Sequence, residues 1–138
     1  MQNHFKEMIS LFHYTVQTSK SIEEAIQSLE ENLKEDKFGV LWKFDVKDTL
    51  KNKGFELENP YMIFEVCNPK EAHKVLSANE LVGYFLPCKI VIYQDKQGKT
   101  NIGMPKPSTL IEMVEDESLH EIASDIENRL IACIDKSR

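Results

Sequence analysis

The sequence contains no hydrophobic run of the length that a membrane-spanning helix needs, which is about 20 apolar residues. Residues 1–7 also lack the charged-then-apolar order of a secretory signal peptide. Only three cysteines are present, none in the CxxC spacing of a zinc site, and free thiols fit a reducing compartment. We therefore expect a cytoplasmic protein that does not bind membranes.

Clusters of lysine and arginine are missing as well. The 138 residues include 17 Lys and Arg against 23 Asp and Glu, which gives a formal net charge of −6 at pH 7. Nucleic-acid binding needs clustered positive charge to neutralise phosphates, so we expect no nucleic-acid partner. Internal repeats, low-complexity segments and complete catalytic motifs are also absent from the sequence, so the residues alone name no reaction.

The length of the chain fits one domain with its own core. We expect an N-terminal extension over residues 1–11 and a single α+β domain over residues 12–138. Apolar alternation predicts strands over 12–16, 38–46, 61–67, 88–94 and 99–104. Helical spacing predicts helices from 22, 49, 69, 108 and 118. The order β-α-β-(short α)-β-α-β-β-α predicts a curved, mainly antiparallel sheet of about five strands with helices on one face.

Several helix starts carry the residue types that cap helices. Ser21 with Glu24, and Ser118 with Glu121, have the spacing of a capping box. Asn68 precedes a proline suited to the first helical position. Asp45 or Asp48 is expected to cap the short helix that follows the second strand.

Two of the predicted strands differ in their apolar pattern. Along the strand over 38–46, one face is expected to carry Val40, Trp42, Phe44 and Val46. The strand over 61–67 is nearly all apolar, as a strand covered on both faces is. It nevertheless contains Glu65, and such a carboxylate must be paired, exposed at an edge or functional.

Cys67 and Cys88 are the first candidates for chemistry. If their strands are neighbours, the two thiols lie close, and they could exchange a disulfide or hold a soft metal. Cys88 is the sharper candidate because it follows Pro87 at a strand start, where Lys89 or a helix N-terminus would lower its pKa. The alternative is that both cysteines are small buried residues of the sheet.

Other polar residues have one functional and one structural interpretation each. Asn68 lies at a helix start whose free N–H groups could bind an anion, or it only caps that helix. His73 is a ligand or proton donor, or simply polar surface. Asp45 and Lys47 form an acid–base pair, or a cap with a surface ion pair.

A group of short motifs resembles the small bacterial and archaeal family called domain of unknown function 302. The matching segments are residues 37–41, 45–47 with 50–51, 67–69 with 72–73, 83–88 and 104–105. The combination of Cys67-Asn68-Pro69 with Leu86-Pro87-Cys88 is the most specific part. The resemblance implies a fold similar to the TATA-box-binding-protein class and a homodimer. It implies no agreed reaction, and fold similarity transfers no function.

Four hypotheses follow from these residues. The first is a non-catalytic, homodimeric binding or sensing module with a small-molecule site near Cys67, Asn68 and Cys88. The second is a thiol-dependent redox or transfer enzyme that uses Cys88. The third is a zinc-type soft-metal site of Cys67, Cys88 and either His73 or Glu65, although no motif implies a cofactor. The fourth is a purely structural role for the last helix.

Overall fold

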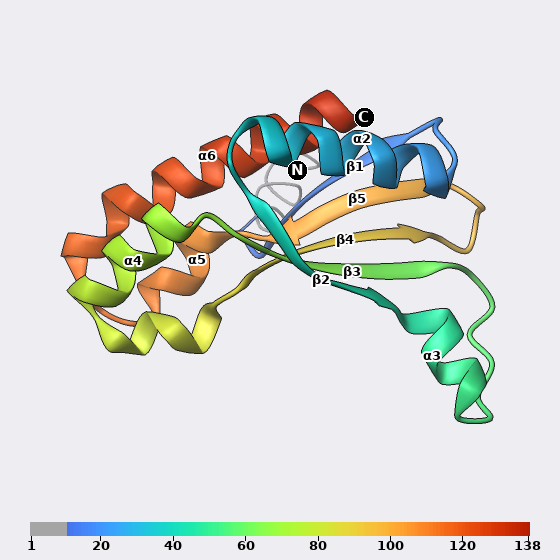
Figure 1. Ribbon diagram of the computed structural model, residues 1–138, viewed down its shortest axis with the longest axis horizontal. Coiled ribbons are helices and arrows are strands. Elements are labelled where there is room, and N and C mark those ends of the chain that lie inside the picture. Colours follow the sequence, from blue (N-terminus) through green and yellow to red (C-terminus); the bar gives the residue numbers. More distant parts are fainter. Residues whose placement is uncertain (1–10) are drawn as a thin grey trace, which may run out of the picture.

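The computed structural model describes residues 11–138, which form a five-stranded sheet with helices packed on one face (Figure 1). The extension expected for residues 1–11 falls almost entirely outside the described residues. The strands are β1 (His13–Thr18), β2 (Gly39–Asp45), β3 (Tyr61–Cys67), β4 (Cys88–Gln94) and β5 (Thr100–Pro105). Their order across the sheet is β1-β5-β4-β3-β2, and all four pairings are antiparallel. The predicted α+β class and antiparallel sheet are therefore confirmed.

The two long helices cover one face of the sheet, and shorter helices lie at both of its ends (Figure 1). They are α2 (Ile22–Glu35), α3 (Val46–Asn52), α4 (Pro69–Ala78), η1 (Glu80–Phe85), α5 (Pro107–Glu112), η2 (Glu117–Leu119) and α6 (His120–Ser137). Helices α2 and α6 run side by side over the sheet, whereas α4 and α5 lie beyond one end of it (Figure 1). None of the helices among the described residues is long and apolar enough to cross a membrane.

The core forms between the sheet and the two long helices. Alternation along the central strands turns Phe64, Ile90 and Ile102 toward the helices, and all three are fully buried. Leu29 of α2 and Leu130 of α6 are buried against them. On the other face of β5, Gly103 lies against Thr15 so closely that a side chain has no room there.

Three helix starts are capped as their sequences predict. Ser21 and Glu24 form the complete capping box of α2. The Asn68 side chain accepts hydrogen bonds from the backbone N–H groups of Lys70 and Glu71 at the start of α4. At α3 the structure selects Asp45 as the cap, and its carboxylate accepts from the N–H of Asp48 at 2.9 Å.

The prediction that Val40, Trp42, Phe44 and Val46 share one face is wrong. A register shift between Val40 and Trp42 leaves Val40 on the helix side and turns Trp42 and Phe44 to the opposite side, where their rings stack. Val46 no longer belongs to the strand, because it begins α3. The expectation that β3 is covered on both faces is also wrong, since only Phe64 and Val66 of this strand are buried.

The start of the last helix also differs from the prediction. Ser118 does not cap α6 with Glu121; instead Asp116 accepts from the Ser118 N–H and starts the short turn η2. Helix α6 then follows without a side-chain cap from residue 119. The turn η1 was not expected from the sequence, and it is capped by Asn79, which accepts from the N–H of Leu81.

Candidate functional site

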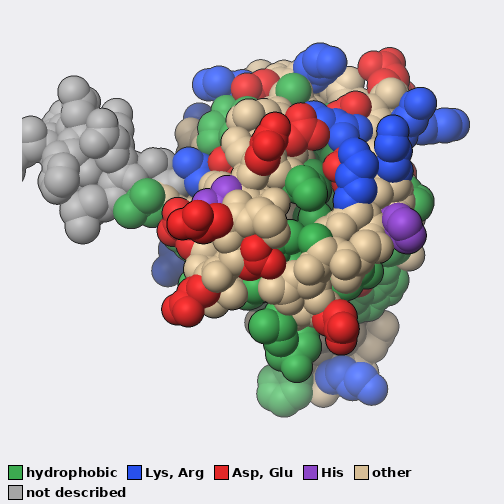
Figure 2. Space-filling view, turned by 90° about the vertical axis from the view of Figure 1, so that its left-hand side faces the viewer, with side chains coloured by type: hydrophobic (Ala, Val, Ile, Leu, Met, Phe, Trp, Pro, Cys, Tyr) green, Lys and Arg blue, Asp and Glu red, His purple; other side chains and the backbone are tan. Residues whose placement is uncertain are grey.

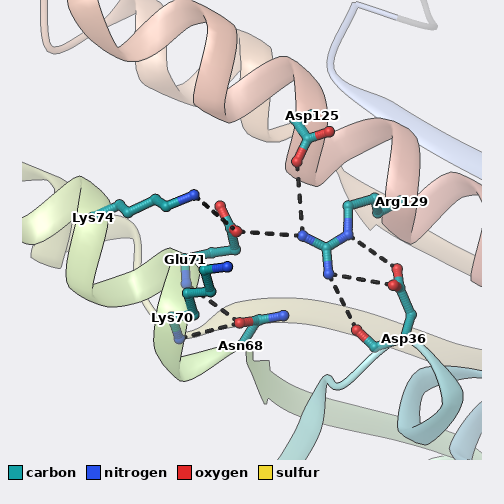
Figure 3. A network of polar contacts seen from close by, with 7 residues as sticks. All are labelled: Asp36, Asn68, Lys70, Glu71, Lys74, Asp125 and Arg129. Atoms are coloured by element: carbon teal, nitrogen blue, oxygen red, sulfur yellow. Dashed lines mark hydrogen bonds and ion pairs between the residues drawn. The ribbon is translucent and has the colours of Figure 1, made fainter.

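Asn68, one of the sequence candidates, lies beside a dense polar network at the start of α4 (Figure 3). Arg129 of α6 is its centre: Nε lies 3.1 Å from an Asp36 carboxylate oxygen, and Nη1 lies 3.5 Å from Glu71. The guanidinium also reaches the Asp36 carbonyl and stands over the Phe38 ring. We call Arg129, Asp36, Glu71 and Asp125 the Arg129 network, and it joins α2, α4 and α6.

The Arg129 network was not identified from the sequence. Hydrogen bonding to Asp36 is the main cause that raises the Arg129 pKa, so the guanidinium stays charged. No buried side-chain nitrogen or oxygen among the described residues lacks a hydrogen-bond partner. The Asn68 side-chain oxygen accepts from the N–H groups of Lys70 and Glu71, so the structural interpretation of Asn68 as a cap accounts for its side-chain hydrogen bonds.

The second region is where strands β4 and β5 separate. Their ladder contains four pairs, and its last pair is Val91 with Gly103. Beyond it, β4 stays paired with β3 as far as Cys88, and β5 stays paired with β1 as far as Pro105. The ladder between them thus ends while both strands continue, and we call this place the fork.

A cavity of about 310 Å³ lies at the fork, and we call it the fork cavity. Its walls come from β3, β4 and β5, from α4 and η1, and from α5 and α6. Among the described residues that line it, all are apolar, aromatic or sulfur-containing apart from Glu65 and Lys89. Figure 2 faces this end of the molecule, and hydrophobic side chains are exposed at its centre within a rim of both charge signs.

Cys88 lines the fork cavity, but Cys67 and Asn68 are not among its described lining residues. Cys88 lies opposite Val66 in the ladder, so these two side chains share a face, and Cys67 follows Val66 onto the other face. All three cysteines are free thiols. The chain thus brings the two strands of Cys67 and Cys88 together without turning both side chains into one cavity.

The Cys88 thiol is not activated by its surroundings. Burial, with a smaller contribution from the nearby Cys67, raises the pKa of Cys88 to about 11. The expectation that Lys89 or a helix N-terminus lowers this pKa is wrong, because Lys89 is the next residue of the strand and turns to the opposite face. Cys88 is a protonated, apolar part of the cavity wall at neutral pH.

Glu65 and Lys89 are direct cross-strand neighbours, and both line the fork cavity. Both residues project from the side of the sheet that the helices leave open, where Glu65 is tolerated in its apolar strand. Because Cys88 projects from the helix side and lines the same cavity, the fork cavity reaches through the fork from one side of the sheet to the other. Sequence reasoning identified Glu65 but missed Lys89 as its neighbour, because the strand register decides that pairing. The remaining lining residues were missed because they come from four separate helices and turns, from the loop before β4 and from the strands.

The weaker candidates lie outside the fork cavity. Asp45 and Lys47 are at the opposite end of the sheet, where Asp45 caps α3 and the Lys47 ammonium donates to the Glu58 carbonyl at 2.7 Å. His73 is exposed on α4. Within residues 11–138, no three His, Cys, Asp or Glu side chains gather in a group that could hold a metal ion. The proposed set of Cys67, Cys88 and His73 or Glu65 is accordingly not assembled.

Comparisons with known proteins agree on one family. The model of the family described as "Domain of unknown function DUF302" matches residues 14–137. The chain is also similar to a solved structure, the crystal structure of an uncharacterized conserved DUF302 protein from Bacillus stearothermophilus. The two share 56% sequence identity with a TM-score of 0.89, over 92% of this chain and 98% of that one. No curated protein matches. From its sequence match and its fold, this chain belongs to the DUF302 family of uncharacterised proteins.

Proposed function

We propose that this protein is a non-catalytic module that binds a small, largely apolar molecule in the fork cavity. The observation that carries the proposal is the cavity itself, about 310 Å³ in volume and apolar on most of its wall. This volume is at the lower end of the range for small-molecule sites, which are mostly apolar with a few polar groups that fix orientation. Of the residues predicted near the site, Cys88 and Glu65 line the proposed pocket.

A thiol-dependent enzyme is the less favoured alternative. Catalysis by Cys88 needs a thiolate, and a pKa of about 11 leaves very little of it at neutral pH. Cys67 has its pKa raised by burial as well. A disulfide between the two would require their side chains to approach across the sheet, whereas alternation directs them to opposite faces. A binding role requires neither a thiolate nor a disulfide.

The binding proposal is tested by protein-detected NMR with a library of apolar fragments. Signals of residues around the fork cavity, including Met104 and Ala123, should shift on binding. The variant Ala123→Phe fills the cavity from α6 and should abolish these shifts. Ala132→Phe, an exposed site on the same helix, is the matched control and should retain them. If no fragment shifts cavity signals, or if Ala123→Phe leaves binding intact, the proposal fails.

We further propose that the module acts in the cytoplasm as a homodimer, with the helix-free side of the sheet as its interface. This side, which we call the open face, carries Trp42, Phe44, Tyr61, Ile63, Val91 and Tyr93. Trp42 stacks on Phe44 and Tyr61 on Tyr93, yet the Trp42 residue remains 51% exposed. An apolar sheet face in contact with water favours association. The net charge of −6 gives no support for DNA binding through a face of the TATA-box-binding-protein type.

Light scattering coupled to size-exclusion chromatography tests the homodimer. The wild-type protein should elute with twice the chain mass of 16.0 kDa. Val91→Glu places a charge in the middle of the open face and should yield monomers. Leu81→Glu changes an exposed apolar residue of η1 and should leave the dimer unchanged. A wild-type monomer, or a dimer that persists in Val91→Glu, would reject this interface.

A further inference from the structure

The two charged residues of the fork cavity are placed together but not paired with each other. Glu65 and Lys89 occupy directly opposed positions of β3 and β4, so their Cβ atoms are about 5 Å apart. Within the part of the chain that the structure describes, neither side chain forms an ion pair or a side-chain hydrogen bond. The opposite situation holds at Arg129, where every carboxylate of the network has a basic partner.

From this arrangement we infer that the fork cavity binds an α-amino acid with an apolar side chain. A free α-amino acid carries an ammonium and a carboxylate on one carbon atom, which matches a carboxylate and an ammonium held side by side on adjacent strands. The Glu65 carboxylate accepts from the ligand ammonium, and the Lys89 ammonium donates to the ligand carboxylate. The inference rests on the proposed function, because it specifies the ligand of the same cavity.

The size and polarity of the cavity fit the rest of such a ligand. A volume of about 310 Å³ equals that of about ten molecules of liquid water, which is room for a leucine or phenylalanine side chain. Cys88 and Met104 place sulfur atoms in the wall, and Tyr84 and Phe85 place aromatic rings there. Thioether and thiol groups pack well against aromatic and branched side chains. A polar or charged side chain would lose its hydration in this cavity without gaining a partner.

The alternative of a simple amphipathic anion uses only Lys89. It leaves Glu65 beside the bound carboxylate, and two like charges at that distance repel each other. A simple apolar amine would pair with Glu65 but would be repelled by the Lys89 ammonium. The zwitterion is the ligand for which both neighbours are favourable, and this difference can be measured directly.

Isothermal titration calorimetry with the full chain separates these possibilities. L-phenylalanine and L-leucine are titrated first, followed by three analogues of phenylalanine: 3-phenylpropionate, 2-phenylethylamine and 2-phenylethanol. We expect the better of the two amino acids to bind at least about tenfold more tightly than its singly charged analogues, since each lost charged hydrogen bond weakens binding by about that factor or more. Leucine is compared in the same way with 4-methylpentanoate and 3-methylbutylamine.

Two charge-removing variants give each residue its own readout. In Glu65→Gln the advantage of the amino acid over the acid analogue should disappear, while its advantage over the amine remains. In Lys89→Gln the reverse should hold. Lys43→Gln, at an exposed lysine of β2, is the control and should change neither ratio. Circular dichroism confirms that each variant is folded.

The outcomes distinguish the ligand class from the binding function. If apolar fragments occupy the cavity but amino acids bind no better than their singly charged or neutral analogues, the ligand class is wrong and the binding proposal stands. The same conclusion follows if amino acids bind and both variants leave the ratios unchanged. If neither amino acids nor fragments bind, the proposed function itself is wrong.

Discussion

The start of α4 and the fork lie at the same end of the sheet, yet charged side chains are paired at the first and unpaired at the second. Around Arg129 the carboxylates of Asp36, Glu71 and Asp125 surround one guanidinium, and these ion pairs join α2, α4 and α6. At the fork the strands separate, a cavity remains, and Glu65 and Lys89 stay unpaired although they are neighbours. Charges that are paired with each other indicate a structural role, whereas unpaired charges beside an apolar cavity indicate a place for a ligand.

The largest expected effect comes from breaking the Arg129 network. Arg129→Met keeps the apolar stem of the side chain but removes the guanidinium, so the largely buried Glu71 retains only Lys74, at 3.6 Å. We expect the free energy of unfolding to fall by about 2–3 kcal/mol, because leaving a mostly buried charge without its partner is costly. Urea denaturation followed by circular dichroism measures this. A loss below about 1 kcal/mol would mean that the network contributes little.

The next prediction compares a packed alanine with one at the cavity. Ala123→Leu adds a side chain where space exists, and the free energy of unfolding should remain within about 1 kcal/mol of the wild-type value. Ala25→Leu adds the same atoms at a fully buried position of α2 outside the cavity, and it should destabilise by about 1–3 kcal/mol. Equal losses in the two variants would show that the fork is packed like the rest of the core.

The pH dependence of stability provides a third comparison, through Cys88. Its folded-state pKa of about 11 is higher than the value of about 8.5 for a free thiol, so folding favours the protonated form. This contribution is complete below about pH 8.5 and is lost as the pH rises through 11. Tyr14 acts in the same direction, because burial and its hydrogen bond to Asp135 raise its pKa to about 12.

Cys88→Ala should therefore flatten the decline in stability between pH 8.5 and 11, as measured by urea denaturation at a series of pH values. Cys67→Ala serves as the comparison, since that thiol has a less buried position and should affect the slope less. Alkylation with iodoacetamide, followed by mass spectrometry, should modify Cys67 before Cys88. Rapid modification of Cys88 at pH 7 would instead support the enzymatic alternative.

The smallest expected effect concerns an ion pair that resembles those of Arg129 only in geometry. Lys43 and Glu30 lie 2.8 Å apart, but their side chains are 47% and 37% exposed. Lys43→Met should lower the free energy of unfolding by less than about 0.5 kcal/mol, because solvent screens such pairs. A loss as large as that of Arg129→Met would contradict the assignment of stability to burial of the network.

The features that the sequence predicted well are those that depend on neighbouring residues. Short apolar runs located β3 and β4. Asn68 was identified as a cap because its side chain bonds to N–H groups two and three residues away. The prediction that Ser118 caps the last helix was wrong because the Ser118 N–H, which a capping box would pair with Glu121, donates to Asp116 two residues earlier. A capping motif read from the sequence can therefore be displaced by another capping residue nearby, and the motif alone does not say which residue forms the cap.

The features that were missed depend on distant parts of the chain. The pairing of Glu65 with Lys89 requires the register of β3 and β4, and the fork requires knowledge of where β4 and β5 stop pairing. The bulge after Val40 turns the Trp42 side chain to the other face, and its position is defined by the pairing with β3. The sequence left open whether the strands of Cys67 and Cys88 are neighbours. They are, but the two side chains lie on opposite faces because Cys88 is opposite Val66 and not opposite Cys67.

The position of β1 has a consequence for how the chain folds. Among the described strands, β1 pairs only with β5, and Tyr14 lies opposite Met104. The first strand can therefore join the sheet only after the last strand has been made. The strands β2 to β5 form three successive antiparallel neighbours along the chain, each joined by a shorter connection. Contacts between distant residues slow folding because a long loop must close first. Closure of the sheet by β1 is thus the step with the greatest entropic barrier, and until it occurs the edge of β5 is exposed to pairing with other chains.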